Sequence, residues 1–279
     1  MPELPEVETI KNAIELAIGN GVINKVRVNN NRFRIVVPED FGDVLEGSRI
    51  RAFRRIAKYI VIDLSNGKSI IWHLGMSGKV KISSELPEFF DKHDHIVIET
   101  TSGVLIFNDA RRFGLITYCE SEKILEHPLF KNIGIEPFDD RLDGKYLYER
   151  LKTKKIPIKV ALLDQSIING TGNIYASEAL YIARIYPRRE SADISLKECN
   201  KIVDAIKATL EKAIEAGGST LRDYRKPDGS MGYFQNMHCV YGKTGQQCSE
   251  CKCDIKKTGG IKKIVQAGRS TFYCETLQK

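Results

Sequence analysis

The period of the hydrophobic pattern changes near residue 120, and this change constrains the fold more than any other feature of the sequence. Before it, alternating or β-branched runs are separated by turn signals such as Ser65-Asn66-Gly67, which is typical of antiparallel strands in a sandwich or barrel. From 144 to 216, apolar residues recur at helical spacing instead. At 279 residues the chain is long enough for two or three units. Strands are predicted at 26–28, 33–37, 59–64, 69–73, 96–100 and 104–107.

The first residues of the chain are predicted to begin a packed helix. Val7, Ile10 and Ile14 fall on one helical face within 5–18, and Gly19 ends the pattern. Pro5 suits the first helical turn, because a proline there loses no hydrogen bond. Chain termini are normally loose, so a terminus fixed in this way is unusual.

The helical part contains a glycine-rich interruption, Asn169-Gly170-Thr171-Gly172. Two helices joined by such a turn form a helix-turn-helix-like unit whose backbone can approach a phosphate closely. Residues 217–235 are rich in glycine, charge and aromatic side chains, which predicts a long mobile loop. Residues 236–279 form a compact cysteine-bearing terminus.

A formal charge of +7 and a pI near 8.9 favour a polyanionic partner, nucleic acid first, although a merely basic protein has the same values. No stretch approaches the roughly 20 apolar residues that a membrane helix needs. The acidic residues Glu3, Glu6 and Glu8 argue against a signal peptide. We therefore expect a cytoplasmic protein, associated with the nucleoid, and no membrane partner.

Seven cysteines are present, and four of them, Cys248, Cys251, Cys253 and Cys274, fall within the last 32 positions. A cytosolic compartment keeps thiols reduced. This cluster therefore indicates a metal site rather than a disulfide framework.

Pro2 and Glu3 form the first candidate catalytic pair. Proline is small enough to permit removal of Met1, which would leave Pro2 with a free secondary amine. An α-amino pKa lies near ~8, so a sizeable neutral fraction exists at physiological pH. Such an amine attacking a sugar C1′ gives an iminium directly, and Glu3 can shuttle a proton to the ring oxygen. A structural proline beside a solvated carboxylate is the alternative.

Lys58 lies in the basic segment 54–59, inside the strand-rich region. An ammonium entering a core is costly unless it meets an anion, so Lys58 is a candidate for binding Glu3 and a phosphate. An exposed charge at a strand edge explains the residue equally well.

Two glycine-bounded segments offer side chains for insertion into a duplex. Met76 lies in the segment 73–78 between two glycines, which favours display on a tight turn over burial. Arg111 and Phe113 precede Gly114, and can pair with an orphaned base edge and stack in the duplex. The alternative for this pair is a strand end with a solvated or phosphate-binding arginine.

Taken in order, these segments resemble the formamidopyrimidine-DNA glycosylase / endonuclease VIII family, and specifically its bacterial purine-acting formamidopyrimidine-DNA glycosylase branch. Any one motif is weak evidence for this family, but eight motifs in the family's order along the whole chain are a specific match. The matching segments are 2–9, 55–59, 73–78, 92–95, 111–114, 172–178, 240–242 and 268–269.

The resemblance implies that Pro2 is the Schiff-base nucleophile, that Glu3 donates the proton that opens the sugar, and that Lys58 assists β-elimination. Relatives of this type excise 8-oxoguanine and formamidopyrimidines and then cut the strand on both sides of the abasic sugar, as hydrolase and lyase in DNA repair. Met76, Arg111 and Phe113 fill the void left by the flipped base. Arg269 joins the catalytic set by gripping a phosphate beside the flipped nucleotide. The remaining DNA contacts are His73, His93, Lys155 (aligned through Lys159), Asn173 and Tyr241. The lesion contacts are Glu6 and, in the loop that caps the lesion, Arg222 and Tyr224.

The cysteine cluster departs from the family's pattern. Relatives place four thiolates around one zinc ion in two Cys-x2-Cys pairs, whereas here Cys248, Cys251 and Cys274 are present and Leu277 occupies the fourth position. The interval is also longer, through 252–260. We expect one zinc ion, with Cys253 as the fourth ligand; Cys239 and His238 are weaker candidates. Alternatively the metal is absent and a hairpin alone presents Arg269.

The expected fold is α+β and multidomain, with an N-terminal helix and antiparallel β-sandwich (1–135), a helix-two-turn-helix domain with a lesion-capping loop (136–235), and a zinc-finger-like β-hairpin (236–279). The expected partner is double-stranded DNA containing oxidised bases, bound by a monomer. Two alternatives are an oxidised-pyrimidine glycosylase of the endonuclease VIII type and a lesion-binding protein without turnover.

Overall fold

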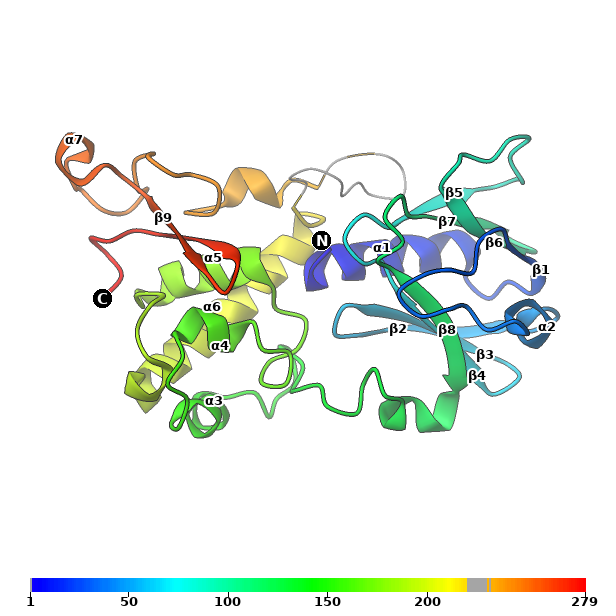
Figure 1. Ribbon diagram of the computed structural model, residues 1–279, viewed down its shortest axis with the longest axis horizontal. Helices are drawn as coiled ribbons and strands as arrows, with labels where there is room; N and C mark the ends of the chain where they lie inside the picture. The colour runs from blue at the N-terminus through cyan, green and yellow to red at the C-terminus, as the bar shows by residue number, and fades with distance from the viewer. Residues whose placement is uncertain (1, 220–229, 231) are drawn as a thin grey trace. The chain divides into compact units, whose positions relative to one another are not determined.

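The computed structural model describes residues 2–219, 230 and 232–279. The chain forms two compact units (Figure 1). The first contains the residues up to 131 together with 216–233, and the second contains 132–215 and 234–279. The predicted division into three domains at 135 and 235 stays a prediction.

The first unit begins with helix α1 (Leu4–Ile18), as predicted. Glu3 is its N-cap and forms a reciprocal capping box with Glu6, and Pro5 lies in the first turn. Gly19 ends the helix with a φ of 35°. The face that α1 buries in the core consists of Leu4, Val7, Ile10, Ile14 and Ile18.

Two antiparallel four-stranded sheets form the predicted sandwich (Figure 1). The first has the order β1 (Ile23–Val28), β6 (Asp94–Thr100), β7 (Gly103–Asn108) and β5 (Lys79–Ser83). The second has the order β2 (Ile50–Ile56), β3 (Tyr59–Leu64), β4 (Lys68–His73) and β8 (Leu115–Glu120). Both sheets and α1 contribute to one apolar core, in which the rings of Trp72 and Phe107 are 5.2 Å apart. The short helices α2 (Phe41–Leu45) and η1 (Ser121–Glu126) complete the unit.

The prediction of a strand at 33–37 is wrong. This segment forms a bend, although Phe33 and Val37 are buried in the core as a strand would bury them. The side-chain oxygen of Asn30 accepts a hydrogen bond from Arg32 N at 2.9 Å, and Val37 N donates to Asn31 O at 3.0 Å. These local bonds take the place of a ladder with a neighbouring strand.

The second unit is helical, as the period predicted. It contains α3 (Gly144–Leu151), α4 (Ile158–Leu162), α5 (Asn173–Ala183), η2 (Ser191–Asp193) and α6 (Leu196–Glu215). The cysteine-bearing terminus adds η3 (Phe234–Met237), α7 (Ile255–Thr258), β9 (Lys262–Gln266) and β10 (Arg269–Tyr273). Figure 1 shows the β9–β10 hairpin in red, and β10 contacts α5.

The hairpin turn consists of only two residues, Ala267 and Gly268, with φ angles of 45° and 72°. Two positive φ values match the right-handed twist of the flanking strands, as in type I′ turns. The turn places Arg269 at the exposed start of β10, directly opposite Gln266. Within the described part of the chain, no helix combines the length and apolarity required to span a membrane.

Candidate active site and nucleic-acid interface

The N-terminal candidates Pro2 and Glu3 are both buried at the start of α1. The Glu6 carboxylate accepts hydrogen bonds from Glu3 N at 2.8 Å and from Ser219 N at 2.7 Å. Gly218 has a φ of +80°, and a Cβ there would lie 2.9 Å from a Glu6 oxygen. Glu6, predicted to contact the lesion, thus joins the helix start to the segment that precedes 220–229. Arg222 and Tyr224 fall outside the described residues.

Lys58 is buried in the turn between β2 and β3. The Arg55 guanidinium donates to a Glu8 carboxylate oxygen at 2.9 Å and to Ala57 O at 2.8 Å. Ala57 has a φ of 53°, which gives the turn its tight shape. Because Glu8 belongs to α1, Arg55 fixes the Lys58 turn to the helix that carries Pro2 and Glu3.

His73, at the end of β4, is buried rather than exposed. Burial, followed by the positive charges of Arg34 and Lys58, lowers the pKa of His73 to about 3. The ring is therefore neutral near pH 7, and its Nδ1 accepts a hydrogen bond from Gly75 N at 2.9 Å. This bond orients the turn that carries Met76. A contact of His73 with DNA stays a prediction.

Met76, Arg111 and Phe113 are displayed on two loops that touch each other. Met76 is 40% exposed and Phe113 is 50% exposed. The Arg111 guanidinium lies 5.6 Å from the centre of the Phe113 ring. A Cβ on Gly75 would lie 2.4 Å from Gly114 N, so the two backbones are in direct contact. The structure therefore brings together the three side chains predicted to fill the void. His93, in the loop between β5 and β6, is half-buried.

In the second unit, Asn173, Tyr241 and the Arg269 hairpin come together from three distant segments. The Asn173 amide donates to the Tyr241 hydroxyl at 3.1 Å and to Ser270 O at 2.9 Å. Ser270 directly follows the exposed Arg269. Lys155 lies in an exposed loop between α3 and α4.

Lys159, to which the sequence assigned no role, is completely buried beneath this cluster. Its ammonium group donates to the Asn173 side-chain oxygen, to Thr271 Oγ1 at 2.9 Å and to Ser270 O at 3.2 Å. The first of these bonds fixes the orientation of the Asn173 amide, whose nitrogen then faces the Tyr241 hydroxyl and Ser270 O. Lys159 thus orients one predicted phosphate contact and anchors the strand that begins with another.

Glu178 is a second residue whose role the sequence did not reveal. It is buried on α5, and its carboxylate accepts backbone N–H bonds from Cys239 at 2.6 Å, Val240 at 3.0 Å and Tyr241 at 2.7 Å. These bonds fix the backbone that carries Tyr241. The only signal in the sequence is an acidic residue on an otherwise apolar helix.

Three thiols of the terminal cysteine cluster are placed to hold a metal ion. The Sγ atoms of Cys248, Cys251 and Cys274 lie within 4.8 Å of one another, and all three side chains are buried. Cys253 is outside that set, but the Gln247 side-chain amide donates to the thiols of both Cys253, at 3.8 Å, and Cys251, at 3.9 Å. Leu277, at the fourth family position, packs against the cluster. All seven cysteines lie in the described residues as free thiols. This donor set fits a thiophilic ion such as zinc.

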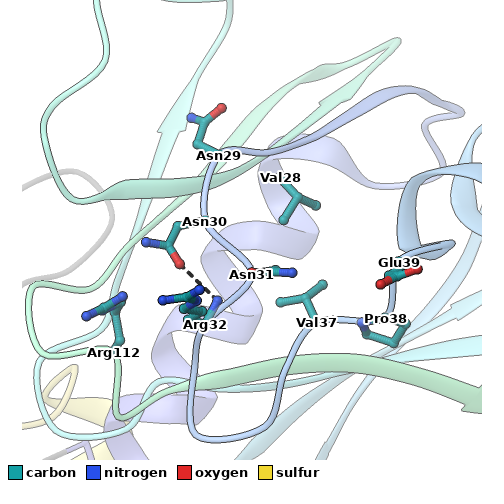
Figure 2. Close-up of a pocket in the computed structure, with 9 residues that line it drawn as sticks. All are labelled: Val28, Asn29, Asn30, Asn31, Arg32, Val37, Pro38, Glu39 and Arg112. Atoms are coloured by element: carbon teal, nitrogen blue, oxygen red, sulfur yellow. Dashed lines mark hydrogen bonds between the residues drawn. The ribbon is translucent and has the colours of Figure 1, made fainter.

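The first unit also has a polar pocket of about 540 Å³ beside the Arg111 loop. Figure 2 shows Arg32 and Arg112 near each other and Glu39 at the other end. Asn30, which bonds Arg32 N, lies between β1 and the bend that replaced the predicted strand. The sequence did not predict this pocket.

Two family models match the chain. The formamidopyrimidine-DNA glycosylase N-terminal domain matches residues 1–116, and the formamidopyrimidine-DNA glycosylase H2TH domain matches 133–225. Curated relatives named formamidopyrimidine-DNA glycosylase include one from Rhodospirillum rubrum, 42% identical over 281 residues, and one from a Wolbachia of Brugia malayi, 44% identical over 279 residues. Both alignments cover 100% of each chain.

Solved structures agree with the sequence relatives. A Lactococcus lactis FPG variant in complex with Fapy-dG containing DNA is 35% identical with a TM-score of 0.90, and the Lactococcus lactis Fpg with abasic-site DNA is 34% identical with a TM-score of 0.89. Each match covers 100% of both chains. The fold and the site therefore define a DNA glycosylase of the base-excision repair type. The chain belongs to the formamidopyrimidine-DNA glycosylase family.

Proposed function

We propose that this chain removes oxidised purines from double-stranded DNA and then cuts the strand at the abasic sugar, with the Pro2 amine as the nucleophile. The observation that carries the proposal is the placement of Pro2 and Glu3, which are both buried at the start of α1, where Glu3 forms the capping box with Glu6. A fixed nucleophile beside a carboxyl group is the arrangement that imine-forming catalysis requires.

The Pro2 nitrogen forms a bond to C1′ as the C1′–N bond to the oxidised base breaks. The base leaves with that electron pair and gains a proton, and the Pro2 nitrogen loses its own, so that the proton count balances. Glu3 protonates the ring oxygen as the C1′–O4′ bond breaks, which leaves an iminium at C1′. Loss of a C2′ proton then expels the 3′ phosphate, and a second elimination expels the 5′ phosphate. Hydrolysis of the imine restores the Pro2 amine. Lys58, fixed to α1 through Arg55 and Glu8, assists the eliminations.

Access to C1′ requires the damaged nucleotide to leave the stack, at a cost of a few kcal/mol. Met76, Arg111 and Phe113 fill the space that it leaves, and His73, His93 and Lys155 contact the DNA around it. Asn173, Tyr241 and Arg269 bind the flanking phosphates, and Glu6, Arg222 and Tyr224 contact the extruded base. We further propose that the chain acts as a monomer at the nucleoid in the cytoplasm.

Borohydride trapping tests this function. Protein shown by mass spectrometry to begin at Pro2 is mixed with a duplex containing 8-oxoguanine, an oxidised pyrimidine or only normal bases, and the imine is reduced. We expect a covalent adduct with the 8-oxoguanine duplex and little with the undamaged one. An adduct confined to the oxidised pyrimidine would indicate an enzyme of the endonuclease VIII type. Tight binding without any adduct would indicate a lesion-binding protein, and either result would refute the proposal.

We further propose that one zinc ion is bound by Cys248, Cys251, Cys274 and Cys253. The grouping of three buried thiols, and the Gln247 amide that donates to both Cys251 and Cys253, support this ligand set. When bound, zinc is a structural ion that closes the loop between 248 and 274, since four thiolates leave no open position for chemistry. Cys253 thereby compensates for Leu277 at the position of the family's fourth cysteine.

Replacing Cys253 by alanine tests the fourth ligand. We expect elemental analysis to find about one zinc ion per chain in the native protein, and a content well below that in Cys253→Ala after dialysis against a mild chelator, because a tetrahedral site with three protein ligands is open to competition. Cys119→Ala removes a half-buried thiol in the other unit and should leave the zinc content unchanged. Full zinc retention in Cys253→Ala would exclude this ligand.

A further inference from the structure

Asp109 is completely buried directly after β7, where the chain enters the loop that carries Arg111 and Phe113. Its carboxylate accepts three hydrogen bonds. One oxygen binds the Ser77 hydroxyl at 2.6 Å and Arg111 N at 3.3 Å, and the other binds Gly114 N at 2.8 Å. A single carboxylate therefore joins the Met76 turn to both ends of the next loop.

The backbone of Asp109 extends the same connection to a third loop. Asp109 N donates to His93 O at 3.1 Å, and Asp109 O accepts from the His95 ring at 3.0 Å. The backbone N–H of Arg112 also donates to Asp109 O, at 3.3 Å. The segments that carry Met76, His93, Arg111 and Phe113 thus share Asp109 as a bonding partner.

The packing around Asp109 leaves these loops little freedom to shift separately. Gly75 has a φ of +64°, and a Cβ there would lie 2.4 Å from the Phe113 carbonyl carbon. A Cβ on Gly114 would lie 2.5 Å from the Phe107 ring and 3.1 Å from the Asp109 carboxylate. The loops can approach so closely only because glycines occupy both contact points.

We propose that Asp109 is a positioning residue that sets Met76, Arg111 and Phe113 in their duplex-entering arrangement before DNA is bound. The inference rests on the proposed function, which assigns these side chains to the void. Burying a carboxylate is costly unless its oxygens are hydrogen-bonded, and here the bonds are all directed to these loops. The ordering of the loops is completed during folding, so it does not oppose DNA binding.

Two variants of this network and one matched control test the proposal. Asp109→Asn preserves the shape but presents an N–H group where the backbone N–H of either Gly114 or Arg111 needs an acceptor. Ser77→Ala removes a single bond from a half-buried residue, which keeps the test valid if Asp109→Asn does not fold. Asp63→Asn is the control, because Asp63 also accepts a serine hydroxyl, from Ser69 at 2.5 Å, but lies in the other sheet.

The measurement compares single-turnover excision of 8-oxoguanine from a duplex with trapping on a preformed abasic site, where no base has to be extruded. We expect Asp109→Asn to slow excision at least about tenfold and Ser77→Ala severalfold, since small misplacements of working groups have large kinetic effects. Trapping on the abasic site should change much less, and Asp63→Asn should match the native protein in both assays.

Double variants separate positioning from general stability. If Asp109 acts through the inserted side chains, Asp109→Asn combined with Phe113→Ala should be little slower than Phe113→Ala alone. If the losses of excision rate in the two single variants multiply in the double variant, the role of Asp109 is purely structural and the inference is overturned. Equal losses in the excision and trapping assays, with a lowered Tm, would overturn it as well. Native excision in Asp109→Asn and Ser77→Ala, with slow excision in Phe113→Ala, would also overturn it. Failure of the native protein to form any adduct would instead refute the proposed function.

Discussion

A chain in which Pro2 is replaced by glutamine should form no borohydride-stable adduct with an 8-oxoguanine duplex. Glutamine is too large to permit removal of Met1, so the amine is moved one residue away and the nitrogen at position 2 becomes an amide. An amide nitrogen is not a nucleophile at neutral pH. We expect the rate of adduct formation to fall about 10³-fold or more, as when a catalytic nucleophile is lost.

Pro2→Gly is the matched control for this experiment. Glycine permits removal of Met1 and leaves a primary amine with a pKa near ~8 at the same position. Because a primary amine still forms an imine, Pro2→Gly should be trapped, more slowly than the native protein. Mass spectrometry establishes which terminus each variant carries. Normal trapping by Pro2→Gln with Met1 retained would rule out the terminal amine of Pro2 as the nucleophile.

Glu3→Gln is expected to have the second largest effect. Glutamine matches the shape of the N-cap residue and still offers an oxygen acceptor, so α1 should form normally. It has no proton to give to the sugar ring oxygen, and loss of a general acid lowers rates by about 10²–10⁴-fold. Single-turnover excision measures this loss, and the Kd for a non-cleavable abasic analogue should change little.

Glu15→Gln provides the comparison on the same helix. Glu15 is exposed and pairs only with Lys11 among the ion pairs of the described residues, so its neutralisation should leave excision unchanged. Excision by Glu3→Gln at the native rate would show that another group donates the proton.

The sequence predicted the elements whose apolar pattern is regular, and missed those whose pattern is hidden. The helix α1 was predicted because its buried apolar residues recur at helical spacing, and the central strands β3, β4 and β6 were predicted because each is buried along most of its length. Strand β2 was missed because it lies at a sheet edge and is mostly exposed, with arginines along its length. Strands β5 and β8 were missed as well.

The candidate site divides in the same way. Pro2, Lys58, Asn173 and Arg269 stand in motifs that can be recognised along the chain. The residues that orient candidate DNA contacts, Lys159, Glu178 and Asp109, are polar groups in the interior, and their hydrogen-bond partners lie up to 112 positions away. The spacing of residues along the sequence does not identify such distant partners, so these roles can be assigned only when the fold is known. Cys253 is intermediate, because the motif showed that the fourth family ligand is missing, and Cys253 as its substitute stays a prediction.

The buried Lys159 has a consequence for how the second unit attracts DNA. Mobile ions weaken the field of an exposed charge strongly and that of an enclosed charge much less. The ammonium of Lys159 is enclosed beneath Asn173 and the Arg269 hairpin, whereas Lys155 is open to solvent. The bonds of Lys159 to Asn173 and to the hairpin should therefore persist, and keep these phosphate contacts in place, at ionic strengths that screen the exposed charge of Lys155.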